Sequence, residues 1–174
     1  MSRILFGPEQ SDAIRYLLQS LFVTELLSPS KKLWLVFGWI SDVEIIDNRT
    51  REFNSLEPDW GNTMIRLSKI LKALLTRGSE INLIIRDVPH NTQRDFFRKI
   101  MEYKQEFPAL LKYHLDQTIH NKGIVGDDFI FTGSMNLTHY GITVNDESLS
   151  FATETEQVEE WKISLEDTWN EKLK

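Results

Sequence analysis

The sequence predicts an α/β fold in which helices cover a β-sheet. Helical and strand-type patterns alternate along the chain, which is the arrangement that puts helices on a sheet. The strand-type segments are short apolar runs bounded by turn residues, as expected for buried strands. Hydrophobic residues make up 41% and charged residues 26% of the 174 residues, which is typical of a globular protein. We therefore expect residues 1–174 to form a single domain.

The first half of the chain predicts two helices, two strands and one long loop. Apolar residues fall at helical spacing over 10–27, where Ser11 is a candidate cap, and again over 67–75, where Gly78 suits the helix end. The two strands are expected at 33–37 and 81–85. Residues 47–63 are polar and predict a long loop, and loops of this length in compact domains are often functional.

The second half of the chain predicts a further helix, a strand, a hairpin, a last strand and a C-terminal helix. Pro108 ends the helix, and a turn at 126–128 has the composition of a tight hairpin. The expected ranges, in the order of the elements named, are 96–103, 111–115, 124–131, 148–153 and 158–169.

The chemistry of the chain is concentrated between His120 and Glu147. His120 and Lys122 are two residues apart, so on a β-strand both side chains would project from the same face. Ser134 and Asn136 then add a hydroxyl and an amide. Such a set suits a phosphodiester, because the cation and neutral donors hold phosphoryl oxygens while histidine attacks phosphorus or carries a proton near neutral pH.

This pattern resembles the signature of the phospholipase D superfamily, which is His-x-Lys, four residues, Asp, a short strand and then Gly-Ser-x-Asn. The matching positions, together with the family's downstream polar pair, are His120, Lys122, Asp127, Gly133, Ser134, Asn136, Asn145 and Glu147. One departure is that the interval between Asp127 and Gly133 is one residue shorter than in the family pattern. The resemblance is strong over 111–153 and fainter over 31–41 and 66–86. It implies a mixed β-sheet flanked by helices on both faces.

The resemblance also implies a role for each matching residue. Lys122 and Asn136 would hold the phosphate, although Asn136 could equally cap a following short helix. Glu147 would orient the catalytic imidazole through its second nitrogen. Gly133 and Ser134 would let donors approach the anion closely. Asp127 and Asn145 are interpreted as structural parts of the motif.

A working site in this superfamily uses two copies of the motif, whereas this chain carries one. The resemblance therefore implies a homodimer, in which a two-fold axis brings the same patch of both subunits together. One His120 would form a phosphohistidine, and the second would protonate the leaving oxygen and then activate water. No cofactor is expected.

The expected function is a metal-independent phosphodiesterase, most simply a DNA endonuclease, because small single-motif members of the superfamily are mostly nucleases. The segments TGSMNLTHYGITVNDE and LWLV-x-x-WISD also resemble phospholipase D-like proteins encoded in bacterial DNA-modification and phage-defence clusters. Partner proteins from such a system are a further expectation. Two alternatives stay open: a phospholipid hydrolase or phosphatidyl transferase, and a non-catalytic nucleic-acid-binding subunit.

The composition of the chain excludes several kinds of site. The chain has no cysteine, which excludes disulfides and zinc–thiolate sites, and His90, His114 and His139 show no metal-ligand spacing with a carboxylate. We expect no metal. The apolar runs are short and the N-terminus lacks a secretory pattern, so no membrane contact and a cytoplasmic location are expected.

The net charge of −6 is unusual for a protein that binds nucleic acid, so binding would depend on local cations. The basic groups that could supply them are Lys31 with Lys32, Arg49 with Arg51, and Arg94 with Arg98 and Lys99. In the long loop, Arg49 and Arg51 could meet phosphates, and Trp60 could stack on a base. The other tryptophans, which are Trp34, Trp39, Trp161 and Trp169, are expected in the core.

Overall fold

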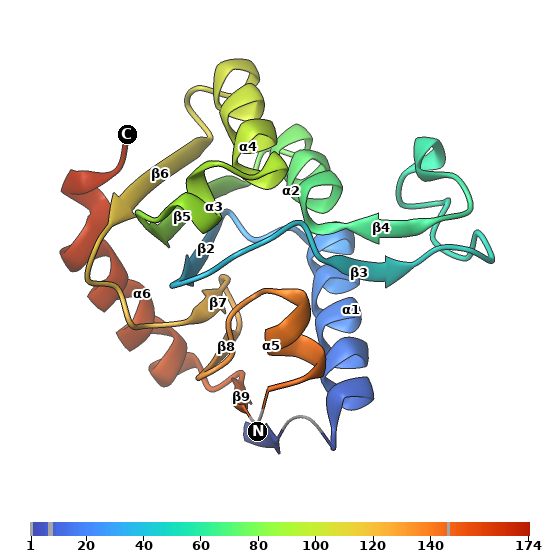
Figure 1. Cartoon of the computed structure of the whole chain (residues 1–174), viewed down its shortest axis with the longest axis horizontal. Coiled ribbons are helices and arrows are strands. Elements are labelled where there is room, and N and C mark those ends of the chain that lie inside the picture. Colours follow the sequence, from blue (N-terminus) through green and yellow to red (C-terminus); the bar gives the residue numbers. More distant parts are fainter. Residues whose placement is uncertain (1, 7–8, 146) are drawn as a thin grey trace.

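The fold is built on one mixed sheet of seven strands in the order β1-β9-β8-β7-β2-β5-β6, with a small hairpin, β3–β4, beside it (Figure 1). The structure is a computed structural model and describes residues 2–6, 9–145 and 147–174. The strands are β1 (Ser2–Phe6), β2 (Lys32–Phe37), β3 (Glu44–Asp47), β4 (Met64–Arg66), β5 (Glu80–Arg86), β6 (Leu111–Asp116), β7 (Gly123–Val125), β8 (Ile130–Gly133) and β9 (Ser148–Ala152). The helices are α1 (Ser11–Leu27), α2 (Leu67–Thr76), α3 (Pro89–Thr92), α4 (Asp95–Glu106), α5 (His139–Thr143) and α6 (Thr155–Trp169), with 3₁₀ turns η1 (Pro58–Trp60) and η2 (Asn170–Lys172).

The strand directions bring several chain ends to one edge of the sheet. β2, β5 and β6 run parallel, whereas β7 is antiparallel to β2 and to β8. Val36, near the end of β2, therefore lies opposite Gly123 at the start of β7, and Gly123 lies opposite Thr132 near the end of β8. The carboxyl ends of β2 and β5 and the open end of the β7–β8 hairpin consequently share an edge.

Helices cover both faces of the sheet, as the sequence predicted. Along β2, Leu33, Leu35 and Phe37 belong to the larger core, which α1, α2 and α4 complete. The alternate residues Trp34 and Val36 belong to a smaller core, completed by apolar side chains of α6. This alternation explains the continuous apolar run, because both faces of a central strand are buried. In Figure 1, α6 lies on one side of the sheet and α1 and α2 on the other.

The predicted helices 10–27, 67–75, 96–103 and 158–169 correspond to α1, α2, α4 and α6, and the predicted strands and hairpin are also present. The expected cap was wrong, because the N-cap of α1 is Gln10 and no side chain caps this end. Strands β1, β3 and β4 and helix α3 were not predicted. No helix in the described part of the chain is long and apolar enough to cross a membrane.

The long polar segment is a folded excursion of the β3–β4 hairpin. Asn48 is fully buried and fastens it, since its Nδ2 donates to Asn54 Oδ1 at 2.8 Å and to Gly61 O at 2.6 Å. Its Oδ1 accepts from Phe53 N at 2.8 Å. Trp60 is only 7% exposed and packs in the larger core. This placement contradicts the expected stacking of Trp60 on a base, because a buried ring offers no free face.

Candidate active site

The two halves of the sequence motif meet at the edge of the sheet where β2 and β5 end. Gly133 N, at the end of β8, donates to Lys122 O just before β7, with an N···O distance of 3.4 Å. Ser134 and Asn136 follow directly, and the segment carrying His120 enters the same edge from β6. Ligands of open α/β sheets commonly bind outside the carboxyl ends of the strands, which is where these side chains gather.

His120 and Lys122 lie in an irregular segment between β6 and β7, and not on a strand as predicted. The two residues are joined by a hydrogen bond instead, in which Lys122 Nζ donates to the backbone oxygen of His120 at 2.8 Å. The His120 side chain is exposed, and its ring has no hydrogen-bond partner among the described residues. The imidazole is therefore accessible to a substrate or to a second protein chain.

Arg86, which was not predicted from the sequence, forms a hydrogen bond with the backbone just before His120. Arg86 Nη2 donates to Ile119 O at 2.9 Å, and its guanidinium lies 5.2 Å from the centre of the Trp39 ring. Trp39 was expected in the core but is 40% exposed. Arg86 thus connects the end of β5 to the backbone next to the candidate nucleophile.

Asn136 is oriented by the backbone that follows β2. Its Oδ1 accepts a hydrogen bond from Trp39 N at 2.9 Å. With the carbonyl side of the amide engaged, Nδ2 is left as a donor, and it has no partner among the described residues. Asn136 does not cap α5, because the N-cap is Thr138, whose hydroxyl accepts from Gly141 N at 3.1 Å. The capping alternative is therefore wrong, and the amide is free for an anion.

Ser134, Asn145 and Glu147 form a small network beside this amide. Ser134 Oγ donates to Glu147 Oε2 through a short hydrogen bond, and it accepts from Ser148 N at 3.0 Å. Asn145 Nδ2 donates to Glu147 Oε1 at 3.2 Å. Both carboxylate oxygens of Glu147 are thereby held in place. No contact with the His120 ring is present among the described residues, so the orienting role of Glu147 stays a prediction.

Gly133 is needed because β9 passes very close to it. A Cβ atom at this position would lie 2.0 Å from Ser148 O, which belongs to the backbone of β9. Ser134 N donates to the same carbonyl at 3.0 Å. Only glycine lets β8 approach β9 in this way and deliver Ser134 to the network with Glu147.

Asp127 contacts the segment that precedes β2. Its Oδ2 accepts from Lys31 N at 2.8 Å, and its own N–H donates to Ser30 Oγ at 2.9 Å. These bonds fasten the β7–β8 turn to the connection between α1 and β2. The turn lies at the end of the hairpin opposite Lys122 and Gly133. Asp127 thus lies away from Lys122 and Gly133, and its structural role in the motif stays a prediction.

Arg49 and Arg51 are not brought to this edge. In Figure 1 the excursion between β3 and β4 extends beyond α1 and α2, on the opposite side of the molecule from the β6–β7 connection. Arg49 binds Asp47, with Nη2···Oδ2 at 2.6 Å and Nε···Oδ1 at 2.9 Å. Hydrogen bonding by this guanidinium lowers the pKa of Asp47 to about 2. A role for Arg49 and Arg51 in substrate binding stays a prediction.

The described part of the chain has two cavities, of about 420 and about 280 Å³, and neither is lined by His120, Lys122 or Asn136. The smaller one lies between α1 and the β3–β4 hairpin, where its wall includes Asp47 and Arg49. Among the described residues, no group of three His, Asp or Glu side chains is arranged to hold a metal ion.

Comparison with known proteins gives a family match. A family model described as cardiolipin synthase, PLD-like domain, matches residues 45–169, which includes every motif residue named above. No curated protein matches the sequence significantly.

Solved structures share the fold over nearly the whole chain. NucT from Helicobacter pylori superposes with a TM-score of 0.65 at 16% identity, covering 99% of this chain and 97% of that one. Nuc from Salmonella typhimurium, described as a phospholipase D family member, gives 0.63 at 19% identity, covering 100% and 96%. Phosphatidylserine synthase from Haemophilus influenzae gives 0.63 at 16% identity, covering 99% of this chain but 39% of that one.

Proposed function

Because the chain belongs to the phospholipase D-like family, we propose that it is a metal-independent phosphodiesterase, and specifically a DNA endonuclease that works as a homodimer. The observation that carries this proposal is the convergence of three groups at one edge of the sheet. These are the exposed imidazole of His120, the ammonium of Lys122 and the free amide nitrogen of Asn136. They supply a nucleophile, a cation and a neutral donor for one phosphodiester.

The proposed reaction has two steps. A ring nitrogen of His120 attacks phosphorus, so that a P–N bond forms while the P–O bond to the leaving group breaks. In the second step water attacks the phosphohistidine, which forms the product phosphomonoester and releases the imidazole. Lys122 and Asn136 hold the non-bridging oxygens, whose charge is more concentrated in the transition state than in the substrate.

A second histidine is required because the leaving oxygen must receive a proton in the first step. The described part of one chain places no other titratable side chain in contact with the His120 ring. A two-fold axis beside His120 would supply the same residue from the partner subunit, which first acts as acid and then as base toward water. Light scattering should therefore give a dimer at micromolar concentration. A monomer with full activity would contradict this part of the proposal.

DNA is proposed as the substrate on the basis of the single motif and of the solved structures that match the chain over nearly their whole length. NucT and Nuc are covered almost completely by this chain, whereas phosphatidylserine synthase is more than twice as long as the matched region. The similarity of two sequence segments to proteins of DNA-modification and phage-defence clusters supports a role in such a system, with partner proteins.

A phospholipid hydrolase or phosphatidyl transferase is the second candidate. The fold shared with phosphatidylserine synthase and the description of the family model favour it. The headgroup phosphodiester of a phospholipid would contact the same side chains of His120, Lys122 and Asn136.

One experiment separates the candidates. The protein is incubated in EDTA with single-stranded DNA, with duplex plasmid and, in parallel, with phospholipid vesicles, and His120→Ala is the matched control. We expect DNA cleavage by the wild type and none by the variant. Release of headgroup with intact DNA would favour the lipid candidate. Tight binding of DNA that is recovered intact would instead indicate a non-catalytic binding subunit.

A further inference from the structure

A cavity of about 420 Å³ is lined in part by residues that lie close in the chain to Asn136 and to its partner Trp39. Its wall includes Ser41 and Asp42, which follow the Trp39 backbone that orients Asn136. On the other side it includes His139, three residues beyond Asn136. Ser41 N donates to Leu137 O at 2.9 Å, which ties these two walls together. The cavity is therefore the neighbour of the proposed phosphate site on the same part of the surface.

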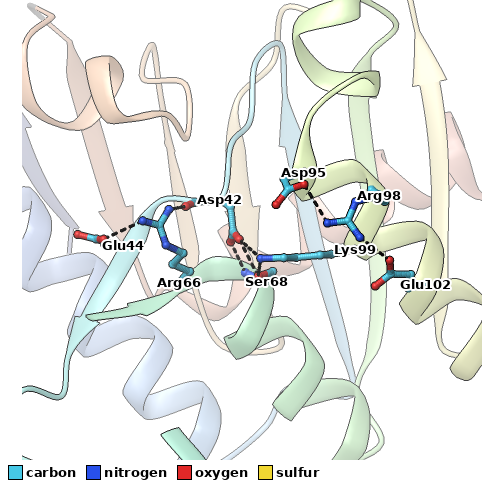
Figure 2. A network of polar contacts seen from close by, with 8 residues as sticks. All are labelled: Asp42, Glu44, Arg66, Ser68, Asp95, Arg98, Lys99 and Glu102. Atoms are coloured by element: carbon cyan, nitrogen blue, oxygen red, sulfur yellow. Dashed lines mark hydrogen bonds and ion pairs between the residues drawn. The ribbon is translucent and has the colours of Figure 1, made fainter. Parts of the chain in front are cut away.

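The carboxylates in the wall of this cavity already have cationic partners from the protein. Figure 2 shows this network, in which Asp42, Glu44 and Asp95 are each engaged by a basic side chain. The three ion pairs are Lys99 Nζ to Asp42 Oδ2 at 2.8 Å, Arg66 Nη2 to Glu44 Oε1 at 2.9 Å, and Arg98 Nη2 to Asp95 Oδ1 at 2.9 Å. Asp42 also accepts from the N–H and the hydroxyl of Ser68, both at 2.8 Å. These acids are thus neutralised within the protein.

The remaining charged side chains of the wall are cationic and lack such partners. Arg15 from α1 and Arg94 just before α4 line the cavity, and neither makes a hydrogen bond or ion pair with its side chain among the described residues. His90 from α3 and His139 from α5 add two imidazoles that also lack polar partners there. The charged side chains of the wall that lack a partner in the described structure are therefore both cationic, and the two imidazoles and the Ser41 hydroxyl add further groups that can donate hydrogen bonds.

We propose that this cavity binds a phosphate of the nucleic-acid strand next to the one that is cleaved. This inference rests on the proposed function, because it assumes a polynucleotide lying across His120 and Asn136. A guanidinium presents paired N–H donors that match two oxygens of one phosphate, and Arg15 of α1 and Arg94, just before α4, both line this cavity. A volume of about 420 Å³ is in the range of small-ligand sites and accommodates a phosphodiester with its sugar.

The cavity would affect how tightly the nucleic-acid strand binds and how it is positioned along the site, and it would not affect the chemical step. Contacts to flanking phosphates position a strand without reading its sequence. A substrate that contains only the scissile phosphodiester does not reach the cavity, so its hydrolysis should not depend on Arg15 or Arg94. This difference between long and minimal substrates separates the cavity from the active site.

The test compares the double variant Arg15→Ala/Arg94→Ala with the control Lys69→Ala/Lys172→Ala. Both remove two positive charges, and the control lysines are exposed and lie outside the cavity. Binding of a fluorescein-labelled single-stranded DNA is measured by anisotropy against salt concentration, with His120→Ala in every protein to prevent cleavage. Hydrolysis of bis(p-nitrophenyl) phosphate is measured with His120 intact.

We expect the cavity variant to bind DNA about tenfold more weakly than the control, the effect of losing charged hydrogen bonds to one phosphate. The slope of log affinity against log salt should become flatter by about 0.7, the value for one phosphate contact on a single strand. Hydrolysis of bis(p-nitrophenyl) phosphate should match the wild type. Because Arg15 is half-buried and its loss could unfold the protein, Arg94→Glu alone provides a second variant at an exposed position.

Equal DNA affinity and salt slope in the cavity and control variants would overturn the proposal. Loss of binding to phosphatidylglycerol vesicles with unchanged DNA binding would also overturn it, since the cavity would then take a lipid headgroup. Failure of the wild type to hydrolyse bis(p-nitrophenyl) phosphate would refute the proposed chemistry instead. The comparison of DNA binding would still decide whether the cavity is a phosphate site.

Discussion

The substitution Gly133→Ala tests the geometry that joins the two halves of the candidate site. The added Cβ atom would lie 2.0 Å from Ser148 O and 3.0 Å from Leu149 Cα. Because Cβ atoms do not approach other heavy atoms closer than 3.0 Å, β8 and β9 must separate by about 1 Å at this point. Both clashing atoms belong to the backbone, so no side chain can rotate away to relieve the contact.

The expected loss of stability comes from the hydrogen bonds that the separation of β8 and β9 would break. Ser134 N donates to Ser148 O, and Ser148 N donates to Ser134 Oγ, each at 3.0 Å. Two such bonds contribute about 1 kcal/mol each, and forcing an extra methyl group into a packed position costs about 1–3 kcal/mol. We therefore expect the free energy of unfolding to fall by about 3–5 kcal/mol. The displaced Ser134 would also release Glu147, so activity should fall in the molecules that remain folded.

Urea denaturation measures the first effect, and kcat/KM on bis(p-nitrophenyl) phosphate, under conditions where the variant stays folded, measures the second. The matched control is Gly61→Ala. Gly61 has a φ of +67°, but a Cβ there would meet nothing within 4 Å. It should therefore cost only the backbone strain, about 1–2 kcal/mol, and leave activity unchanged. The reasoning is refuted if Gly133→Ala is no less stable than Gly61→Ala and hydrolyses the substrate at the wild-type rate.

Four further predictions concern chemistry, metal use, the β3–β4 excursion and a buried acid. Lys122→Ala should reduce kcat severely with little change in urea stability, whereas an unfolded variant would mark this lysine as structural. EDTA should leave activity intact, and activity that disappears and returns with magnesium or zinc would contradict the mechanism. The sequence predicts that Arg49→Ala/Arg51→Ala weakens DNA binding and flattens its salt slope without changing the cleavage rate of bound DNA. Because the excursion lies away from the candidate site and Arg49 is paired with Asp47, this substitution tests the prediction directly, and wild-type affinity and slope would exclude the excursion from the binding surface. Burial raises the pKa of the Glu25 carboxyl above its ordinary value of 4.5. The protonated side chain therefore stabilises the folded protein fully below pH 4.5, and this stabilisation is lost as pH rises through the raised pKa. Glu25→Gln should therefore lose less stability than the wild type between about pH 4.5 and neutrality in urea titrations, and parallel curves would show that Glu25 is not the cause.

The sequence predicted the interior of the fold well because burial leaves a periodic signal. Both faces of β2 and β5 are covered, so their apolar runs are continuous and easy to recognise. β1 leaves a weaker signal, because it forms an edge of the sheet and exposes Ile4 and Phe6. Helix α3 has only four residues and is too short for a helical period to appear.

At the candidate site, the spacing of the motif predicted which residues gather, but not how they are held. The bonds from Trp39 N to Asn136 Oδ1 and from Arg86 Nη2 to Ile119 O join residues far apart in the chain. No local pattern encodes such contacts. Trp60 was misjudged for a related reason, since a tryptophan in a polar segment can be the anchor that packs that segment on the core.

The net charge of −6 becomes compatible with a nucleic-acid substrate once the charges are placed in the structure. Five of the 26 acidic residues lie on α6, across the sheet from α1, and Glu156, Glu159 and Glu160 among them are exposed. Exposed charges interact over about 8–10 Å at physiological salt, so these acids act on their own face and not on a distant one. At the proposed substrate edge the acids of the cavity are already paired, while Arg15 and Arg94 are not. The attraction for a phosphate backbone is therefore set by a few local cations, and it should respond to their removal far more than to an equal change in total charge.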